Sequence, residues 1–463
     1  MRSSDTSLRL LPVLYVIFLV ASIALVIAAN SQGVLTKEEA SSGFVNPAFL
    51  EFRLQHHLFG TNFYAYAYFW ITKHFYKELF YSRLAKAVIA STLPCFIFLY
   101  LRKRFDFGAL EAFAAALGIA FLPGIFGFSW VGVDFGMEMP IGCCALWLAL
   151  YDSTAAIVAS SFLAAVSAET YGAGLAFLAA VAAGHAWHFR SLASRRTAVL
   201  AGFAVMAGTL AFPAFWWTNV QTLLTGGGTT QFAGAFQRLA QLGGELAVQG
   251  DSYYFFNNGA PALASPLIAL LALAGFVMAC VRDARRTWTL LLICVVSVAI
   301  YAIAGNVLGV RRAQPLVLAL GIFAWLLLRT LVASKSPVLR TSAYVAFAVW
   351  MASVSYDWIA VRQGLSSAKI ALPHDFEFFV PEGQTMASTF SGLLNGSIQL
   401  PQDLAGYEPD RTLCILYVLG KPPVAPSPRE IIARCDQHGW SIRSASPRFM
   451  RLRHAAKRLM SRL

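Results

Sequence analysis

Long apolar runs separated by short polar segments fill most of the chain, and this pattern predicts a bundle of membrane-spanning helices. A bilayer core requires about 20 apolar residues per helix. Eleven runs approach that length, and the three between residues 138 and 187 are short and closely spaced. The predicted spans are residues 11–29, 86–101, 109–127, 138–151, 153–168, 170–187, 197–217, 263–281, 287–305, 314–333 and 342–360.

The composition supports this interpretation. Hydrophobic residues make up 58% of the 463 residues and charged residues only 13%, and the mean hydropathy is +0.61. These values exclude an ordinary soluble globule and predict an all-α polytopic membrane protein. The first run has no small-residue cleavage motif before the next polar segment, so we expect a retained signal anchor.

Lysine and arginine predict the orientation. They gather in short loops at residues 102–104, 188–196, 282–286 and 335–340, all on one side of the predicted bundle. Short loops rich in these residues stay in the cytoplasm. We therefore expect a multi-pass protein of the cell inner membrane with a cytoplasmic N-terminus. The net charge of +13 is divided among these loops, so no nucleic-acid partner is predicted.

Residues 1–362 form the predicted transmembrane domain, and residues 363–463 form a second region. The second region contains a strand-like run at 413–419 and a helix-like run at 428–434. It predicts a small α+β domain, which an odd number of spans places in the periplasm. Cys414 and Cys435 could form a disulfide there or remain unpaired. The basic C-terminal end predicts either an amphipathic helix on anionic lipid or a frayed terminus.

Acidic residues are rare, yet several lie at the predicted outer ends of the spans. Glu38 and Glu39 follow the first span, Asp134 and Glu138 lie in the loop after the third, and Glu169 lies at a later external turn. Desolvated carboxylates beside a bilayer are costly and usually functional. These residues are therefore candidates for chemistry on the outer surface, with a helix cap or simple loop solubility as the structural alternative.

Three external segments are predicted, at about residues 30–85, 128–138 and 218–262. The two long ones could wall a cavity at the membrane surface or could serve only as structural packing. The first has helix-like apolar spacing and contains His56 and His57. Neighbouring helical residues diverge by about 100°, so a metal shared by this pair is not expected. We predict that His57 helps to bind substrate.

Three motifs resemble those of the GT-C superfamily of membrane glycosyltransferases, in the branch of protein O-mannosyltransferases and aminoarabinose transferases. The first is an acidic pair after the first span, Lys37-Glu38-Glu39-Ala40, where that branch commonly has Asp-Glu-Ala. The others are the second acidic motif and an arginine-bearing approach to a late span through a proline. They read Val133-Asp134-Phe-Gly-Met-Glu138 and Gly309-Val-Arg311-Arg312-Ala-Gln-Pro315.

The resemblance implies a single inverting displacement that moves a sugar from a polyprenyl-phosphate donor to a cell-envelope lipid, glycan or protein. Glu38, Glu39 and Asp134 would be the catalytic residues, with Glu38 the first choice for the base that deprotonates the acceptor. The remaining candidates for substrate binding are Glu138, Arg311 and Arg312. Arginine holds phosphate in a bidentate manner. No cofactor and no divalent metal are expected.

Two other classes remain open. A transporter or lipid-linked-sugar flippase would place ionisable groups in mid-membrane or break its helices in matching halves. A non-catalytic subunit of polysaccharide assembly would tolerate replacement of Glu38 or Asp134.

Overall fold

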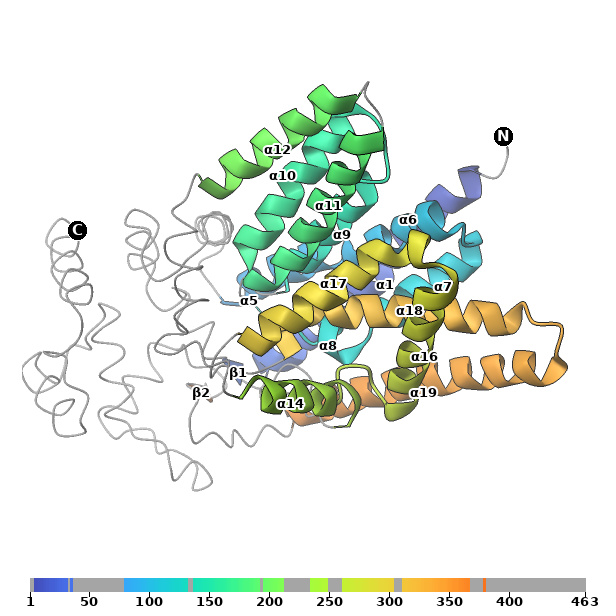
Figure 1. The fold of residues 1–463 in the computed structure, drawn as a ribbon. Helices are drawn as coiled ribbons and strands as arrows, with labels where there is room; N and C mark the ends of the chain where they lie inside the picture. Colours follow the sequence, from blue (N-terminus) through green and yellow to red (C-terminus); the bar gives the residue numbers. More distant parts are fainter. Residues whose placement is uncertain are drawn as a thin grey trace, which may run out of the picture.

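The computed structural model describes residues 4–31, 34–35, 79–131, 136–191, 195–211, 234–248, 260–303, 310–366 and 378–379. Within these ranges the chain is a bundle of helices (Figure 1). Two short strands, β1 (Val34–Leu35) and β2 (Phe378–Phe379), pair in antiparallel fashion. The predicted all-α membrane class is confirmed for the bundle. Nearly all of the predicted α+β region falls outside the described residues.

The helices follow the predicted spans in order. The first half contains α1 (Ser4–Ser31), α5 (Leu79–Ala90), α6 (Leu93–Phe105), α7 (Ala109–Ala120), α8 (Pro123–Phe126), α9 (Glu138–Leu148), α10 (Thr154–Thr170), α11 (Leu175–Ser191) and α12 (Arg196–Ala211). The second half contains α14 (Ala235–Ala247), α16 (Pro266–Arg282), α17 (Ala284–Ile303), α18 (Gln314–Val332) and α19 (Pro337–Ser366). Two 3₁₀ turns, η2 (Gly172–Gly174) and η5 (Val310–Arg312), precede α11 and α18.

Five helical segments are long and apolar enough to cross a bilayer. They are Leu8–Ala28, Arg83–Phe105, Ala284–Ala302, Gln314–Val332 and Pro337–Ile359. Six shorter apolar helices of 10–17 residues lie among them. Together these segments make the chain a multi-pass membrane protein.

Two spans differ in detail from the prediction. The second is built from α5 and α6, which are separated by a turn at Ser91 and Thr92. The third is broken after α7, and a new helix begins at Pro123. Proline lacks the N–H that an uninterrupted helix would use there, but it fits the first turn of a helix.

Close helix contacts depend on glycine. A Cβ atom placed on Gly275 of α16 would lie 2.1 Å from the carbonyl oxygen of Phe323 in α18. A Cβ atom on Gly142 of α9 would lie 2.2 Å from the ring of Phe177 in α11. Small residues allow helix backbones to approach each other inside a membrane. Glycine therefore permits the close packing of α16 on α18 and of α9 on α11.

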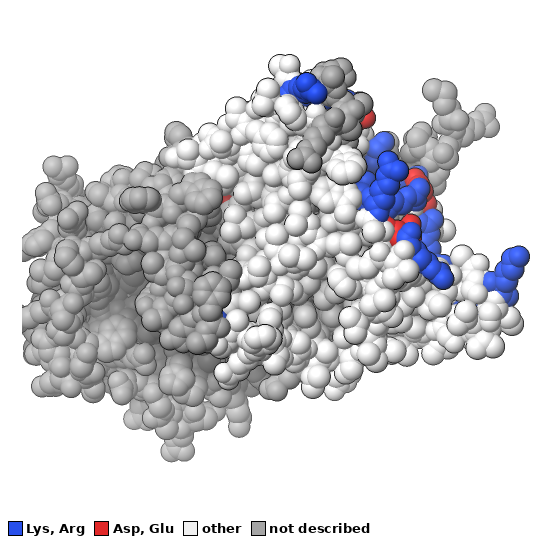
Figure 2. Space-filling model, in the orientation of Figure 1, with Lys and Arg blue, Asp and Glu red and all other residues white. Residues whose placement is uncertain are grey.

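The charged residues mark one end of the bundle. Arg102, Lys103 and Arg104 form the last turn of α6, and Arg282 ends α16. Figure 2 shows blue side chains gathered at one end of the molecule, beside the turn between α18 and α19. We call this the basic end, and we call the opposite end of the bundle the outer end. That the basic end faces the cytoplasm remains a prediction.

Candidate functional site

The structure describes three of the seven predicted site residues. Glu138, Arg311 and Arg312 are described, whereas Glu38, Glu39, Asp134 and His57 lie outside the described residues. The roles of Glu38, Glu39, Asp134 and His57 therefore remain predictions.

Glu138 begins α9 at the outer end and is fully buried. Its Oε2 accepts a hydrogen bond of 2.6 Å from the backbone N–H of Gly136. Gly136 has φ of +87°, and a Cβ atom there would lie 2.9 Å from the Cβ of Phe128. Because only glycine fits this turn, the sequence holds the carboxylate in a fixed position at a helix N-terminus, where negative charge is stabilised.

The end of α10 is fastened to the start of α9. The hydroxyl of Ser167 donates a hydrogen bond of 2.9 Å to the carbonyl oxygen of Glu138. Two residues later, Glu169 is fully buried, and neither of its carboxylate oxygens has a hydrogen-bond partner among the residues that the structure describes. The turn η2 then folds back tightly, since a Cβ atom on Gly174 would lie 2.1 Å from the carbonyl oxygen of Ser167.

Arginine enters the same region from the second half of the chain. Arg311 in η5 is 8% exposed and Arg312 is half-buried. The turn η5 contacts η2, α14 and α17, so the structure brings Arg311 to the outer end of α10. The roles proposed for the second acidic motif and the late arginine pair remain predictions.

Gln314 lies close to Arg312 in sequence and close to the Gly136 turn in space. It begins α18 and is fully buried, and within the described ranges neither its Oε1 nor its Nε2 has a hydrogen-bond partner. A Cβ atom on Gly136 would lie 3.7 Å from its Oε1. The amide thus lies beside the turn that holds Glu138.

Two cations of α5 were missed by the sequence analysis. Arg83 and Lys86 are fully buried, and the guanidinium carbon of Arg83 lies 5.1 Å from the ring centroid of Trp130. Their spacing of three residues puts both on one helix face, and α5 contacts α9. The available signal was a pair of cations in an otherwise apolar run, of which Arg83 falls in the predicted external segment and Lys86 at the start of the predicted second span.

Within the predicted external segment at about 218–262, α14 packs against the outer end of α17. The Tyr301 hydroxyl donates a hydrogen bond of 3.0 Å to Glu245 Oε2, and Gln241 Nε2 donates one of 2.8 Å to Glu245 Oε1. Nearby, Arg238 Nε donates to the carbonyl oxygen of Ala302 at 2.8 Å. Burial raises the pKa of Glu245 above its ordinary value, and the two hydrogen bonds oppose that increase.

Glu245→Gln is expected to remove a pH dependence of stability. The pKa of Glu245 is higher in the folded chain than its ordinary value of 4.5. The contribution of Glu245 to the free energy of unfolding is therefore complete below pH 4.5 and is lost as the pH rises through the raised pKa. The thermal midpoint in detergent should therefore fall more with rising pH for the wild type than for the variant. Parallel pH profiles for the two proteins would contradict this account of Glu245.

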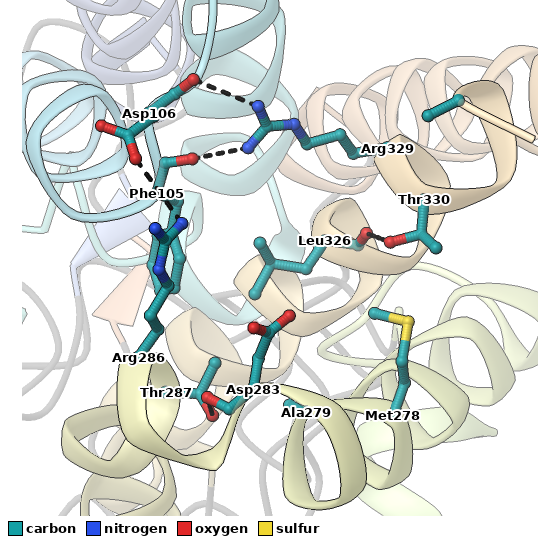
Figure 3. Close-up of a pocket in the computed structure, with 11 residues that line it drawn as sticks. Phe105, Asp106, Met278, Ala279, Asp283, Arg286, Thr287, Leu326, Arg329 and Thr330 are labelled. Atoms are coloured by element: carbon teal, nitrogen blue, oxygen red, sulfur yellow. Dashed lines mark hydrogen bonds and ion pairs between the residues drawn. The ribbon is translucent and has the colours of Figure 1, made fainter.

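A pocket lies at the basic end of the bundle. It has a volume of about 520 Å³ and lies between the α6–α7 turn, the α16–α17 turn and α18 (Figure 3). Arg329 is already engaged there: it donates to the carbonyl oxygens of Phe105 at 2.5 Å and Asp106 at 3.1 Å, and it pairs with Glu111 at 3.2 Å. The charged side chains that line this pocket mainly join the helices through hydrogen bonds and ion pairs, so we do not place the reaction in this pocket.

Arg329→Ala should destabilise the bundle, because Phe105, Asp106 and Glu111 all lose the guanidinium group to which they bond. Hydrogen bonds to charged groups contribute about 1.5–3 kcal/mol each in general, and less when partly exposed. Arg329→Lys should recover only part of the loss, since an ammonium cannot span the two carbonyls and Glu111 as a planar fork does. The measurement is the thermal midpoint of purified protein in detergent. Full recovery by lysine would show that charge alone matters at this position.

Among the residues that the structure describes, no three His, Cys, Asp or Glu side chains gather as a metal ion would require. The predicted acidic pair and His57 lie outside those residues, so the expectation of a metal-independent site remains a prediction.

No family model and no curated protein matches the sequence. Two solved structures are similar in overall fold. One is ArnT from Cupriavidus metallidurans bound to undecaprenyl phosphate, with 16% identity, a TM-score of 0.46, and coverage of 76% of this chain and 76% of ArnT. The other is the same protein in the apo state, with 14% identity, a TM-score of 0.49, and coverage of 84% and 80%. Similarity of this degree does not assign a function.

Proposed function

We propose that the protein is a membrane glycosyltransferase that transfers a sugar from a polyprenyl phosphate to a cell-envelope acceptor, which is a lipid, a glycan or a protein. The main supporting observation is the burial of cations beside carboxylates at the outer end of an apolar bundle. Arg311 lies against the turn that follows Glu169, and Glu138 is fastened to the same helix. Buried charged groups in a membrane bundle are costly and are usually kept for function.

The cations suit the leaving group. When the bond between the anomeric carbon and the phosphate oxygen breaks, its electron pair stays on the polyprenyl phosphate, which gains negative charge. Cations held in a site that excludes water stabilise such charge without reorganisation. Arg311 can bind phosphate oxygens in a bidentate manner, and Arg83 and Lys86 supply two further buried positive charges.

The carboxylates suit the acceptor. An acceptor hydroxyl or amine must lose its proton as its oxygen or nitrogen attacks the anomeric carbon, and a carboxylate within hydrogen-bond reach can take that proton. Glu38, Glu39 and Asp134 are the candidates for this role. A single displacement of this kind inverts the anomeric centre, and the proton passes from the acceptor to the carboxylate.

The placement of the groups disfavours passage of a substrate through the bundle. Glu138, Glu169 and Arg311 all lie at helix ends. A transporter would need ionisable groups near mid-membrane. We therefore propose surface chemistry on the periplasmic face of the inner membrane, with the C-terminal region on the same side.

The test compares the wild type with Glu38→Gln, Glu39→Gln, Asp134→Asn and Glu138→Gln in membranes with matched protein levels. A panel of radiolabelled polyprenyl-phosphate sugars serves as donors, with a membrane extract as acceptor. We expect transfer by the wild type and a loss of about 10²–10⁴-fold in the variant that lacks the base. Undiminished transfer by all four variants would refute the assigned carboxylates.

A further inference from the structure

Glu169 and Gln314 share an unusual property at the outer end. Both are fully buried, and in the part of the chain that the structure describes their four polar side-chain atoms have no hydrogen-bond partner. Leaving a buried polar group unpaired is costly, and most such groups in proteins are satisfied. Two side chains with every polar atom unpaired therefore indicate that something outside the protein completes their hydrogen bonds.

The fold places these two residues in one region. Glu169 lies one residue before the end of α10, and η2 follows it directly. The turn η2 contacts α18, which Gln314 begins, and it contacts α9 as well. The amide oxygen of Gln314 in turn lies beside Gly136, whose N–H donates to Glu138. Glu169 and Gln314 thus lie at helix ends that meet at the outer end of the bundle.

Among the described residues, Glu169 and Gln314 are the two side chains with two unpaired polar atoms each. Ser161, Ser297 and Asp357 each have one such atom, and a serine hydroxyl can rotate toward a carbonyl of its own helix. Glu169 and Gln314 would each need two partners, and local backbone groups provide neither.

We propose that Glu169 and Gln314 form a subsite that binds the hydroxyl groups of a sugar ring, an inference that rests on the proposed function. Each sugar hydroxyl donates one hydrogen bond and accepts others. A carboxyl group offers acceptors, and an amide offers one acceptor and two N–H donors. The pair is thus complementary to neighbouring hydroxyls. An apolar chain would leave all four atoms unpaired.

The sugar has two possible sources, the transferred residue of the donor or a glycan acceptor, and kinetics separate them. Glu169→Gln and Gln314→Leu should each raise KM by about 10–100-fold for the substrate whose hydroxyls they bind. The KM for the other substrate should stay within about twofold. Ser161→Ala is the matched control, because it removes a buried unpaired oxygen from the same helix two turns away from Glu169.

A second readout separates binding from folding. Deoxy analogues of the bound sugar should react more slowly than the parent sugar with the wild type, and Glu169→Gln should lose that discrimination. Gln314→Leu should keep or raise the thermal midpoint in detergent, because it removes two unpaired buried atoms. Lower sugar affinity together with unchanged or higher stability is the expected signature of a binding residue.

The outcomes separate the two proposals. If the wild type transfers sugar and both variants keep wild-type KM values and full discrimination against deoxy sugars, the subsite is refuted and the proposed function stands. If the wild type transfers no sugar from any donor in the panel, the proposed function fails and the subsite fails with it.

Discussion

Arg311→Ala is expected to lower kcat/KM for sugar transfer by about 10²–10³-fold. The side chain is 8% exposed, so its charge acts in a medium that screens it poorly, and removing a preorganised group that stabilises developing charge has effects of this size. Because the charge on the phosphate grows as the glycosidic bond breaks, kcat should fall as well as kcat/KM. The measurement is steady-state transfer by purified protein in lipid nanodiscs.

Two arginines provide the controls for Arg311. Arg312→Ala should have a smaller effect, because that side chain is only half-buried. Arg340→Ala should have none, because Arg340 is exposed in the first turn of α19 at the basic end. Equal losses in Arg311→Ala and Arg340→Ala, at matched protein levels, would show that general membrane electrostatics and not a phosphate site explain the effect.

Gly275→Ala is expected to have the largest effect on folding. The added Cβ would lie 2.1 Å from the carbonyl oxygen and 2.6 Å from the carbonyl carbon of Phe323. Both are backbone atoms, so no side-chain rotation can relieve the overlap, and α16 must move away from α18. Overpacking of this kind costs about 1–3 kcal/mol and sometimes more.

The thermal midpoint and the yield of monodisperse protein in detergent test the effect of Gly275→Ala. Gly208→Ala is the matched control, because a Cβ on Gly208 of α12 meets nothing within 4 Å. That change should be neutral or slightly stabilising, since alanine favours a helix more than glycine does. A Gly275→Ala protein as stable as the Gly208→Ala protein would contradict the close packing of α16 on α18.

Hydropathy predicted the five long membrane-crossing helices well, because a bilayer requires an apolar stretch of sufficient length from each of them. It predicted less about the breaks. The turn at Ser91 and Thr92 lies within an apolar run, and the break before Pro123 depends on packing of α8 against α18 and α19. Hydropathy does not record either feature.

The candidate site was predictable only in part. Glu138 and Arg311 stood out because charge is rare in this chain, and the structure brings their elements to the same end. Arg83 and Lys86 were missed because the predicted span began at residue 86, and burial of a cation is a property of the assembled bundle. The unpaired atoms of Gln314 depend on where α9 and α10 meet α18, which no local pattern in the sequence contains.

A donor that carries one label in its lipid and another in its sugar tests most directly whether the protein transfers the sugar and releases the lipid phosphate. Wild-type protein in proteoliposomes would receive undecaprenyl phosphate labelled in the lipid, joined to a labelled sugar from the panel, with a membrane-extract acceptor on the accessible side. We predict that sugar label in the acceptor and free labelled undecaprenyl phosphate appear in equal amounts. Movement of the intact donor across the bilayer without release of undecaprenyl phosphate would contradict the account and would identify a flippase instead.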